Sequence, residues 1–151
     1  FVDLEEFDVI QDDINLLSLQ SLQKPKLKGV VLMARSPLAT GLLSGRITEK
    51  TIFSDDDHRS KWLHGKRLES IVRRINEIKK YSNMELSELA IRFLNTQSSI
   101  DKIIFGVKRK EHVKNILEQI NKNPLKPTIS KKLFELFEVD FGLKDEIEYS
   151  Y

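Results

Sequence analysis

The sequence predicts an α/β protein built on a parallel sheet, and two features of its pattern lead to this prediction. Short apolar runs that suit buried strands occur at residues 7–11, 30–34 and 103–105. Between and after them lie longer segments whose apolar residues recur every three or four positions, as on one face of a helix. Strands that alternate with helices favour βα units, in which neighbouring strands run parallel.

Composition indicates one soluble globular domain. The chain has 151 residues, of which 40% are hydrophobic and 32% charged. A net charge of +2 is too small to attract nucleic acid by bulk electrostatics. The absence of cysteine excludes disulfides, thiolate metal sites and thiol nucleophiles, and it favours a cytoplasmic location. No apolar run approaches the roughly 20 residues of a membrane span, and the first ten residues show no signal-peptide pattern.

The clearest βα unit lies at residues 102–119. We expect residues 103–105 to form a buried strand, after which Gly106 lets the backbone turn into a helix. The spacing predicts that one face of this helix is buried, and the face consists of Val113, Ile116, Leu117 and Ile120.

Three cations, Lys108, Arg109 and Lys110, lie where this helix begins. A helix N-terminus already carries partial positive charge, so cations there are unfavourable unless an anion binds. Free backbone N–H groups, the helix dipole and the three side chains would together suit one phosphate. The alternative is a solvated basic turn without a ligand.

Residues 35–45 form an apolar loop that contains Pro37 and Gly41, and loops held at strand ends often carry function. An ordinary buried turn is the alternative.

Residues 46–65 are polar and aperiodic, which predicts a lid-like or disordered loop. The run from Asp55 to His58 is interpreted as solvated acidic surface rather than as a metal site. Residues 142–151 are predicted to be a tail.

The remaining periodic segments predict three helices. Residues 66–81 carry one apolar stripe, and their cations are expected to face outward as a solvated surface rather than to bind nucleic acid: Arg67, Arg73, Arg74, Lys79 and Lys80. Asn83 is expected to cap a helix over 84–95, and Ser130 is expected to cap a final helix whose inward residues are Leu133, Phe134 and Phe137.

Three stretches together resemble the C-terminal half of an aldo-keto reductase. FDVIQDDINLL is similar to the sixth barrel strand of that family, and GVVLMARSPLATGLLSG is similar to the seventh strand and its cofactor loop. LAIRFLNTQSSIDKIIFGVKRKEHVKNILE resembles the helix before strand eight, the strand itself and the phosphate loop. The three stretches follow one another in order, with spacing like that of the family.

This resemblance implies the C-terminal half of a TIM (β/α)8 barrel, with parallel strands and outer helices, as a single partial domain over residues 1–151. It implies an oxidoreductase that transfers hydride between NADPH and an aldehyde or ketone. Such barrels bind ligands at the carboxyl ends of their strands, often with phosphate after strands seven and eight.

By the same resemblance, Gln11 would hold the nicotinamide carboxamide, and Arg35 stands where many members place a stacking aromatic residue. Ser36, Pro37, Leu38 and Gly41 would line the pyrophosphate. Gly106, Val107, Lys108 and Arg109 would hold the 2′-phosphate, which favours NADP(H) over NAD. His112 and Asn115 would lie near the adenine ribose and ring.

The catalytic Asp, Tyr, Lys and His of the family come from its first four strands, and these 151 residues do not contain those strands. A whole barrel needs about 250 residues. The leading hypothesis is therefore the NADP(H)-binding portion of a carbonyl reductase, without catalytic residues of its own. The alternative is a non-catalytic half-barrel that binds or assembles with a missing N-terminal half or with itself. A nucleic-acid-binding domain is a third, weaker hypothesis.

Overall fold

The computed structural model describes residues 7–143 and contains one three-stranded parallel sheet. Its strands are β1 (Val9–Asp13), β2 (Val31–Arg35) and β3 (Lys102–Ile103), in the spatial order β1-β2-β3. The pairing aligns Val9 with Val31 and Met33 with Lys102. The predicted parallel α/β arrangement is confirmed, and the carboxyl ends of all three strands lie at one edge.

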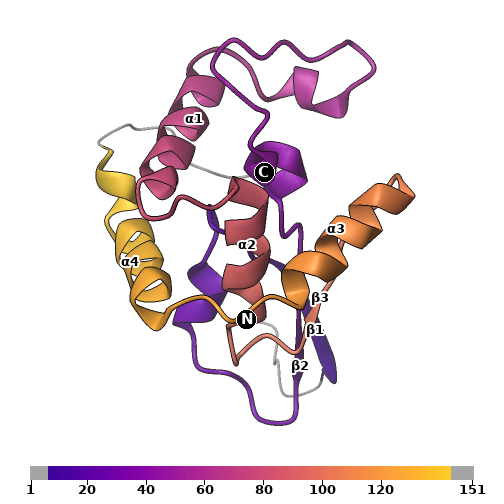
Figure 1. Ribbon diagram of the computed structural model, residues 1–151, viewed down its shortest axis with the longest axis vertical. Coiled ribbons are helices and arrows are strands. Elements are labelled where there is room, and N and C mark those ends of the chain that lie inside the picture. The colour runs from indigo at the N-terminus through magenta and orange to yellow at the C-terminus, as the bar shows by residue number, and fades with distance from the viewer. Residues whose placement is uncertain (1–6, 144–151) are drawn as a thin grey trace.

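Four α-helices accompany the sheet: α1 (Gly65–Lys79), α2 (Leu86–Asn95), α3 (Lys110–Ile120) and α4 (Pro127–Glu138). Three short 3-10 turns precede α1, and one follows α4: η2 (Gln20–Gln23), η3 (Ala39–Ser44), η4 (His58–Lys61) and η5 (Asp140–Gly142). Helices α1, α2 and α4 gather on one side of the sheet, while α3, drawn in orange, projects away from them (Figure 1). Within residues 7–143, no helix is long and apolar enough to cross a membrane.

The core fills the space between these three helices and one face of the sheet. Leu32 and Ala34 of β2 and Ile103 of β3 belong to the core or pack against it. The loop after β2 adds Leu42 and Leu43, both fully buried. Helices α1, α2 and α4 supply most of the remainder: Leu68, Ile71, Ile75, Ile78, Leu89, Ala90, Phe93, Leu94, Leu133 and Leu136.

The strands are less buried than the sequence predicts. Val9 of β1 is 43% exposed, and Ile104, next to β3, is 39% exposed. Side chains alternate between the faces of a strand, so Val31 and Met33 point away from the core that Leu32 and Ala34 join. Both are only partly covered. The reason is that helices cover one face of this sheet, whereas a buried strand needs both faces covered.

Helix α3 forms as predicted, but its apolar face is not buried, which corrects the prediction. None of its residues falls in the buried class, and Val113 and Leu117 are 42% and 54% exposed. The periodicity marks which face is apolar and does not determine whether another element covers that face. In residues 7–143, α3 packs against α2 and leaves much of this face open.

The expectation that Arg74 faces outward is wrong. This residue of α1 is 2% exposed, and its guanidinium makes a two-pronged ion pair with Asp140, with Nη2 at 2.9 Å from each carboxylate oxygen. It also donates to the Ser70 side chain and lies 5.9 Å from the centroid of the Phe141 ring. Arg74 therefore connects α1 to the turn after α4, and it is not available to a nucleic-acid surface.

Two predicted helix caps are also wrong. Helix α2 begins at Leu86 with Glu85 at its N-cap, so Asn83 lies before the helix and does not cap it. Helix α4 begins at Pro127, which places Ser130 inside the helix. Proline suits the first helical turn because its fixed backbone angle is already helical.

The predicted lid-like loop contains η4 and ends where α1 begins, at Gly65. Of the predicted tail, residues 144–151 lie outside the described residues.

A network centred on Glu88 joins α2 to the end of α3. Its carboxylate accepts hydrogen bonds from Arg92 and Lys122, both at 2.7 Å, and its side chain is 16% exposed. These bonds, first that of Lys122 and then that of Arg92, lower the pKa of Glu88 below its ordinary value of 4.5, although burial opposes them.

We predict that Glu88→Gln lowers the free energy of unfolding by about 1 kcal/mol at neutral pH. Because the pKa is depressed in the folded state, the contribution of Glu88 is complete above its unfolded pKa. It disappears as pH falls through the lower folded pKa. The difference from wild type should therefore shrink below about pH 4.5. Urea unfolding at several pH values measures it, with exposed Glu85→Gln as control. A constant difference down to about pH 3 would contradict the prediction.

Candidate functional site

An ion pair spans the carboxyl ends of the first two strands. Asp13 ends β1, Arg35 ends β2, and the register places them opposite one another. Arg35 Nη2 donates to Asp13 Oδ2 at 2.7 Å. The other carboxylate oxygen, Oδ1, is buried and accepts no hydrogen bond within residues 7–143. The Arg35 side chain is 55% exposed, so this edge presents a guanidinium that is partly neutralised.

The loop that follows β2 has a strained backbone. Within residues 36–41, four residues adopt positive φ: Ser36 (52°), Ala39 (48°), Thr40 (52°) and Gly41 (93°). Only glycine adopts such angles without cost, so the surroundings must hold the other three residues. One support is Asn15, fully buried after β1, whose Nδ2 donates to the Ser36 carbonyl at 3.2 Å.

A second support comes from the loop before α1. The Nη1 of Arg59 donates to the Thr40 carbonyl at 3.2 Å. Arg59 is itself fixed by Asp57, whose carboxylate accepts from Nε at 2.9 Å and from Nη2 at 2.6 Å. The guanidinium also stacks on Phe53, 4.5 Å from the ring centroid. Hydrogen bonds from the Arg59 side chain and backbone hold the pKa of Asp57 well below its usual range, and Asp57 in turn raises the pKa of Arg59.

The third contribution to this edge is the turn between β3 and α3. Gly106, Val107 and Lys108 follow the strand, and Arg109 occupies the N-cap of α3 with no side-chain cap. Lys108, Arg109 and Lys110 are all exposed. No salt bridge within residues 7–143 engages them, so their charges face solvent at the positive end of a helix dipole.

The other predicted site residues lie in three places. Arg35, Ser36, Pro37, Leu38 and Gly41 form one continuous segment from the end of β2 into η3. Gln11 lies in the middle of β1, paired with Met33, and is exposed. His112 and Asn115 lie on α3, on the first turns after the basic residues, and both are exposed. The parallel topology thus brings three separate segments to one edge, while Gln11 stands two residues before the end of its strand.

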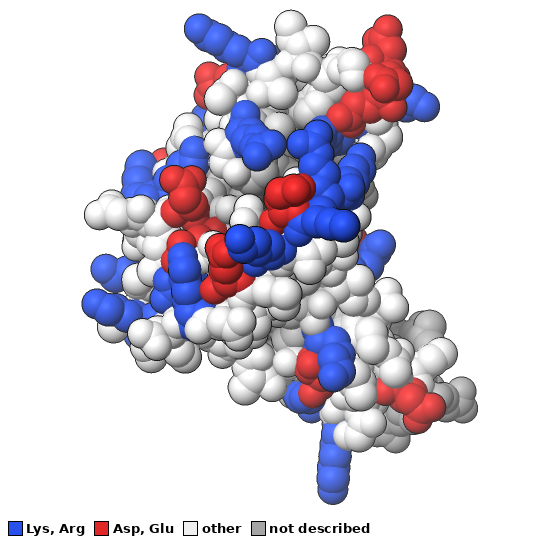
Figure 2. All heavy atoms as spheres, turned by 45° about the vertical axis from the view of Figure 1, so that its right-hand side comes forward, with Lys and Arg blue, Asp and Glu red and all other residues white. Residues whose placement is uncertain are grey.

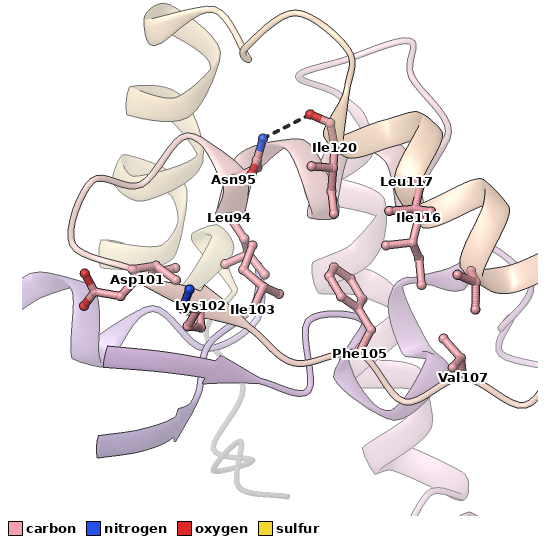
Figure 3. Close-up of a pocket in the computed structure, with 12 residues that line it drawn as sticks. Leu94, Asn95, Asp101, Lys102, Ile103, Phe105, Val107, Ile116, Leu117 and Ile120 are labelled. Carbon is pink, nitrogen blue, oxygen red and sulfur yellow. Dashed lines mark hydrogen bonds between the residues drawn. The ribbon is translucent and has the colours of Figure 1, made fainter. Parts of the chain in front are cut away.

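An apolar groove of about 450 Å³ lies beside this edge, between α3 and the segment that joins α2 to β3 (Figure 3). The four residues of the predicted apolar face of α3 line one wall, and Leu94, Ile103, Phe105 and Val107 line the other side. At one end, Asn95 Nδ2 donates to the Ile120 carbonyl at 3.3 Å (Figure 3). Two ionisable residues, Asp101 and Lys102, also border the groove, and the Asp101 carboxylate is engaged by Lys26 and by the Leu32 backbone N–H. Most of the remaining lining is apolar.

The sequence profile of the aldo/keto reductase family matches residues 7–136. The chain belongs to the aldo/keto reductase family. The match includes all three strands and almost all of the four helices, and it agrees with the resemblance seen in the strand and loop motifs. No curated protein sequence matches the chain significantly.

Two solved aldo-keto reductases have similar folds. The glycerol dehydrogenase of Gluconobacter oxydans superposes with a TM-score of 0.73 at 18% identity, over 95% of this chain and 45% of the dehydrogenase. An aldo-keto reductase of Bacillus halodurans, in its holo form, gives 0.60 at 17% identity, over 87% of this chain and 41% of that enzyme. The chain therefore spans less than half the length of these two relatives.

Several residues of this aldo/keto reductase chain went unassigned in the sequence. Asp13 ends β1, and Asn15 lies two residues after it and is fully buried. The available sequence signal was an Asn placed just beyond a predicted strand. Asp57 lay within the run from Asp55 to His58 that was interpreted as solvated surface, and Arg59 lay in the predicted lid-like loop. Their spacing of two residues is typical of a turn in which an Asp side chain accepts the backbone N–H of residue i+2. No group of three or more metal-binding side chains occurs in residues 7–143.

Proposed function

We propose that this chain is the NADP(H)-binding portion of an aldo-keto reductase, an oxidoreductase that transfers hydride between NADPH and an aldehyde or ketone. Family membership supports an oxidoreductase of this kind, and the Bacillus relative in holo form supports a bound cofactor. The proposal places the cofactor along the carboxyl edge of the sheet, where α/β barrels bind their ligands.

The observation that carries the proposal is the basic turn at the start of α3. Lys108 and Arg109 have exposed, unneutralised charges, and the helix N-terminus adds backbone N–H groups. A 2′-phosphate distinguishes NADP(H) from NAD(H), and it is a dianion that suits these donors. His112 and Asn115, on the same helix, are the proposed contacts of the adenine ribose and ring.

The remaining cofactor contacts are assigned along the carboxyl edge of the sheet, in order from β3 to β1. Gly106 and Val107 would let the backbone approach the 2′-phosphate. Ser36, Pro37 and the backbone of 38–41 would line the pyrophosphate. Gln11 would bind the carboxamide, and Arg35 would face the nicotinamide ring. A guanidinium can stack on such a ring, but its charge favours the neutral reduced ring over the cationic oxidised one. The cytoplasmic location suggested by the cysteine-free sequence remains a prediction.

We predict that the 151-residue protein binds NADPH but reduces no carbonyl compound. Tyr81, the one tyrosine within residues 7–143, lies just after α1, and the catalytic residues of the family come from strands for which this sequence shows no counterpart. Fluorescence titration with NADPH and a turnover assay with an aldehyde panel test both parts. Binding without turnover is the expected result. Turnover by the purified chain would show that the catalytic residues lie within it, and absence of NADPH binding would contradict the cofactor proposal.

A second candidate function is assembly, and the open groove beside α3 favours it. Within residues 7–143, strands β1 and β3 each leave one edge unpaired. Several of the exposed apolar residues lie in or just before β1 or in the segment from β3 into α3: Phe7, Val9, Ile104, Val107, Val113 and Leu117. Unpaired edges and apolar patches of this kind are usually covered by another chain or segment. We propose that a missing N-terminal half-barrel or a second copy of this chain covers them.

For assembly we predict that the isolated chain self-associates at low micromolar concentration or binds a hydrophobic dye. Leu117→Lys should reduce both effects because it places a charge on the exposed face of α3. The matched control is Val139→Lys, since Val139 is 64% exposed but lies at the end of α4, away from the groove. Sedimentation and dye fluorescence measure the outcome. A dye-negative wild-type monomer, or equal effects of the two variants, would contradict an assembly role for this face.

A further inference from the structure

The loop over residues 46–64 makes a specific contact with the strained loop after β2. The two residues in contact, Arg59 and Thr40, are 19 positions apart in the sequence. Arg59 reaches the Thr40 carbonyl, and its other nitrogens are occupied by Asp57. Both side chains are largely covered, at 22% and 23% exposure. A long surface side chain usually samples many conformations, whereas three independent contacts confine this one: the Asp57 carboxylate, the Phe53 ring and the Thr40 carbonyl.

The Thr40 carbonyl that accepts this bond lies within the strained part of the loop. Thr40 and Gly41 are consecutive residues with left-handed backbone angles, inside a segment that is otherwise a 3-10 helix. The fit is close, because a Cβ built on Gly41 would lie 3.1 Å from Arg59 Nη1. A non-glycine residue keeps such angles only if its surroundings fix them. Downstream, Leu42 and Leu43 anchor the loop in the core, and upstream Asn15 holds Ser36.

We infer that Asp57 and Arg59 form a clamp that positions the cofactor-facing loop, residues 36–41, at Thr40, while Asn15 holds the same loop at Ser36. Arg59 is a positioning residue and does not itself touch substrate or cofactor. Its fork geometry is needed, because one planar guanidinium must satisfy a carboxylate and a carbonyl at once while stacking on a ring. The inference rests on the proposed function only for the statement that residues 36–41 face the cofactor.

Hydrogen exchange of the backbone amides of residues 38–43 tests the clamp directly. In Asp57→Asn and Arg59→Ala, these amides should exchange on the order of tenfold faster, as expected for loss of a charge-assisted hydrogen bond that opposes local opening. Arg59→Lys should resemble Arg59→Ala, because an ammonium cannot make the fork. The matched control is Asp55→Asn, which makes the same chemical change on an exposed residue two positions away.

A second measurement separates this inference from the proposed function. NADPH affinity, titrated in the full-length protein, should fall severalfold in Asp57→Asn and Arg59→Ala and stay unchanged in Asp55→Asn. Faster exchange with unchanged NADPH affinity would retain the clamp and overturn the placement of the cofactor on this loop. Unchanged exchange, full rescue by Arg59→Lys, or equal acceleration in Asp55→Asn would overturn the clamp.

Discussion

Replacement of Lys108 and Arg109 by alanine is expected to weaken NADPH binding roughly 10- to 100-fold, since each lost charge-assisted hydrogen bond to a phosphate costs about 1.5–3 kcal/mol before solvent screening. NADH lacks the 2′-phosphate, so its affinity should change less than about threefold. The reason is structural: both side chains are exposed at the N-terminus of α3. The measurement is a fluorescence titration of both cofactors against the full-length protein.

The control variant must remove the same number of positive charges at a site away from the basic turn. Lys131 and Lys132 are adjacent and exposed on α4, and their double replacement by alanine removes two positive charges far from the basic turn. It should leave both affinities unchanged. Equal losses for NADPH and NADH in Lys108→Ala/Arg109→Ala would mean that the turn binds no 2′-phosphate, and would favour the interpretation as a solvated basic turn.

Arg74→Ala should lower the free energy of unfolding by about 2 kcal/mol, as expected for loss of hydrogen bonds to a charged group; the Asp140 side chain is 53% exposed, so water can solvate the carboxylate that remains. The variant loses the bonds to Asp140 and Ser70, the contact with Phe141 and the packing of a fully buried side chain. It should also loosen the turn after α4, because Asp140 and Phe141 hold positive φ there. Denaturant unfolding measures the loss.

Arg73 supplies the comparison for this prediction, because it is the preceding residue of α1 and is exposed. Arg73→Ala should cost less than about 1 kcal/mol, as is usual for an exposed charge. If the two variants lost the same stability, the burial of Arg74 would have no energetic consequence, and the original expectation of two equivalent outward cations would be restored.

The fold could be predicted from the sequence wherever periodicity reflects local geometry. Helix α1 was expected at 66–81 and forms at Gly65–Lys79. Arg74 shows where charge misled the prediction: it follows Ile71 by three positions and precedes Ile78 by four, so it lies on the apolar stripe. Its charge suggested solvent, but a partner from a distant turn, Asp140, made burial possible.

The candidate site was less predictable, because its contacts join segments with no common period. The pair of Asp13 and Arg35 depends on strand register, and the bond from Arg59 to Thr40 joins two irregular loops. Neither contact can be predicted from the spacing of residues along the sequence. The surface charge also gives little guidance, since Figure 2 shows acidic and basic side chains intermixed rather than gathered in one patch of a single sign.

Helix α3 carries two different surfaces on one rigid element: the basic turn at its N-terminus and the apolar face that lines the groove. Whatever fills the groove restricts the orientations of α3 and therefore those of Lys108 and Arg109. An anion that then binds loses less conformational entropy, because the turn is already ordered. Linkage makes the effect reciprocal, so occupation of the groove and binding of the anion raise each other's affinity by the same factor. If the two proposals hold, filling of the groove and binding of the 2′-phosphate would therefore be coupled, and each could be measured through the other.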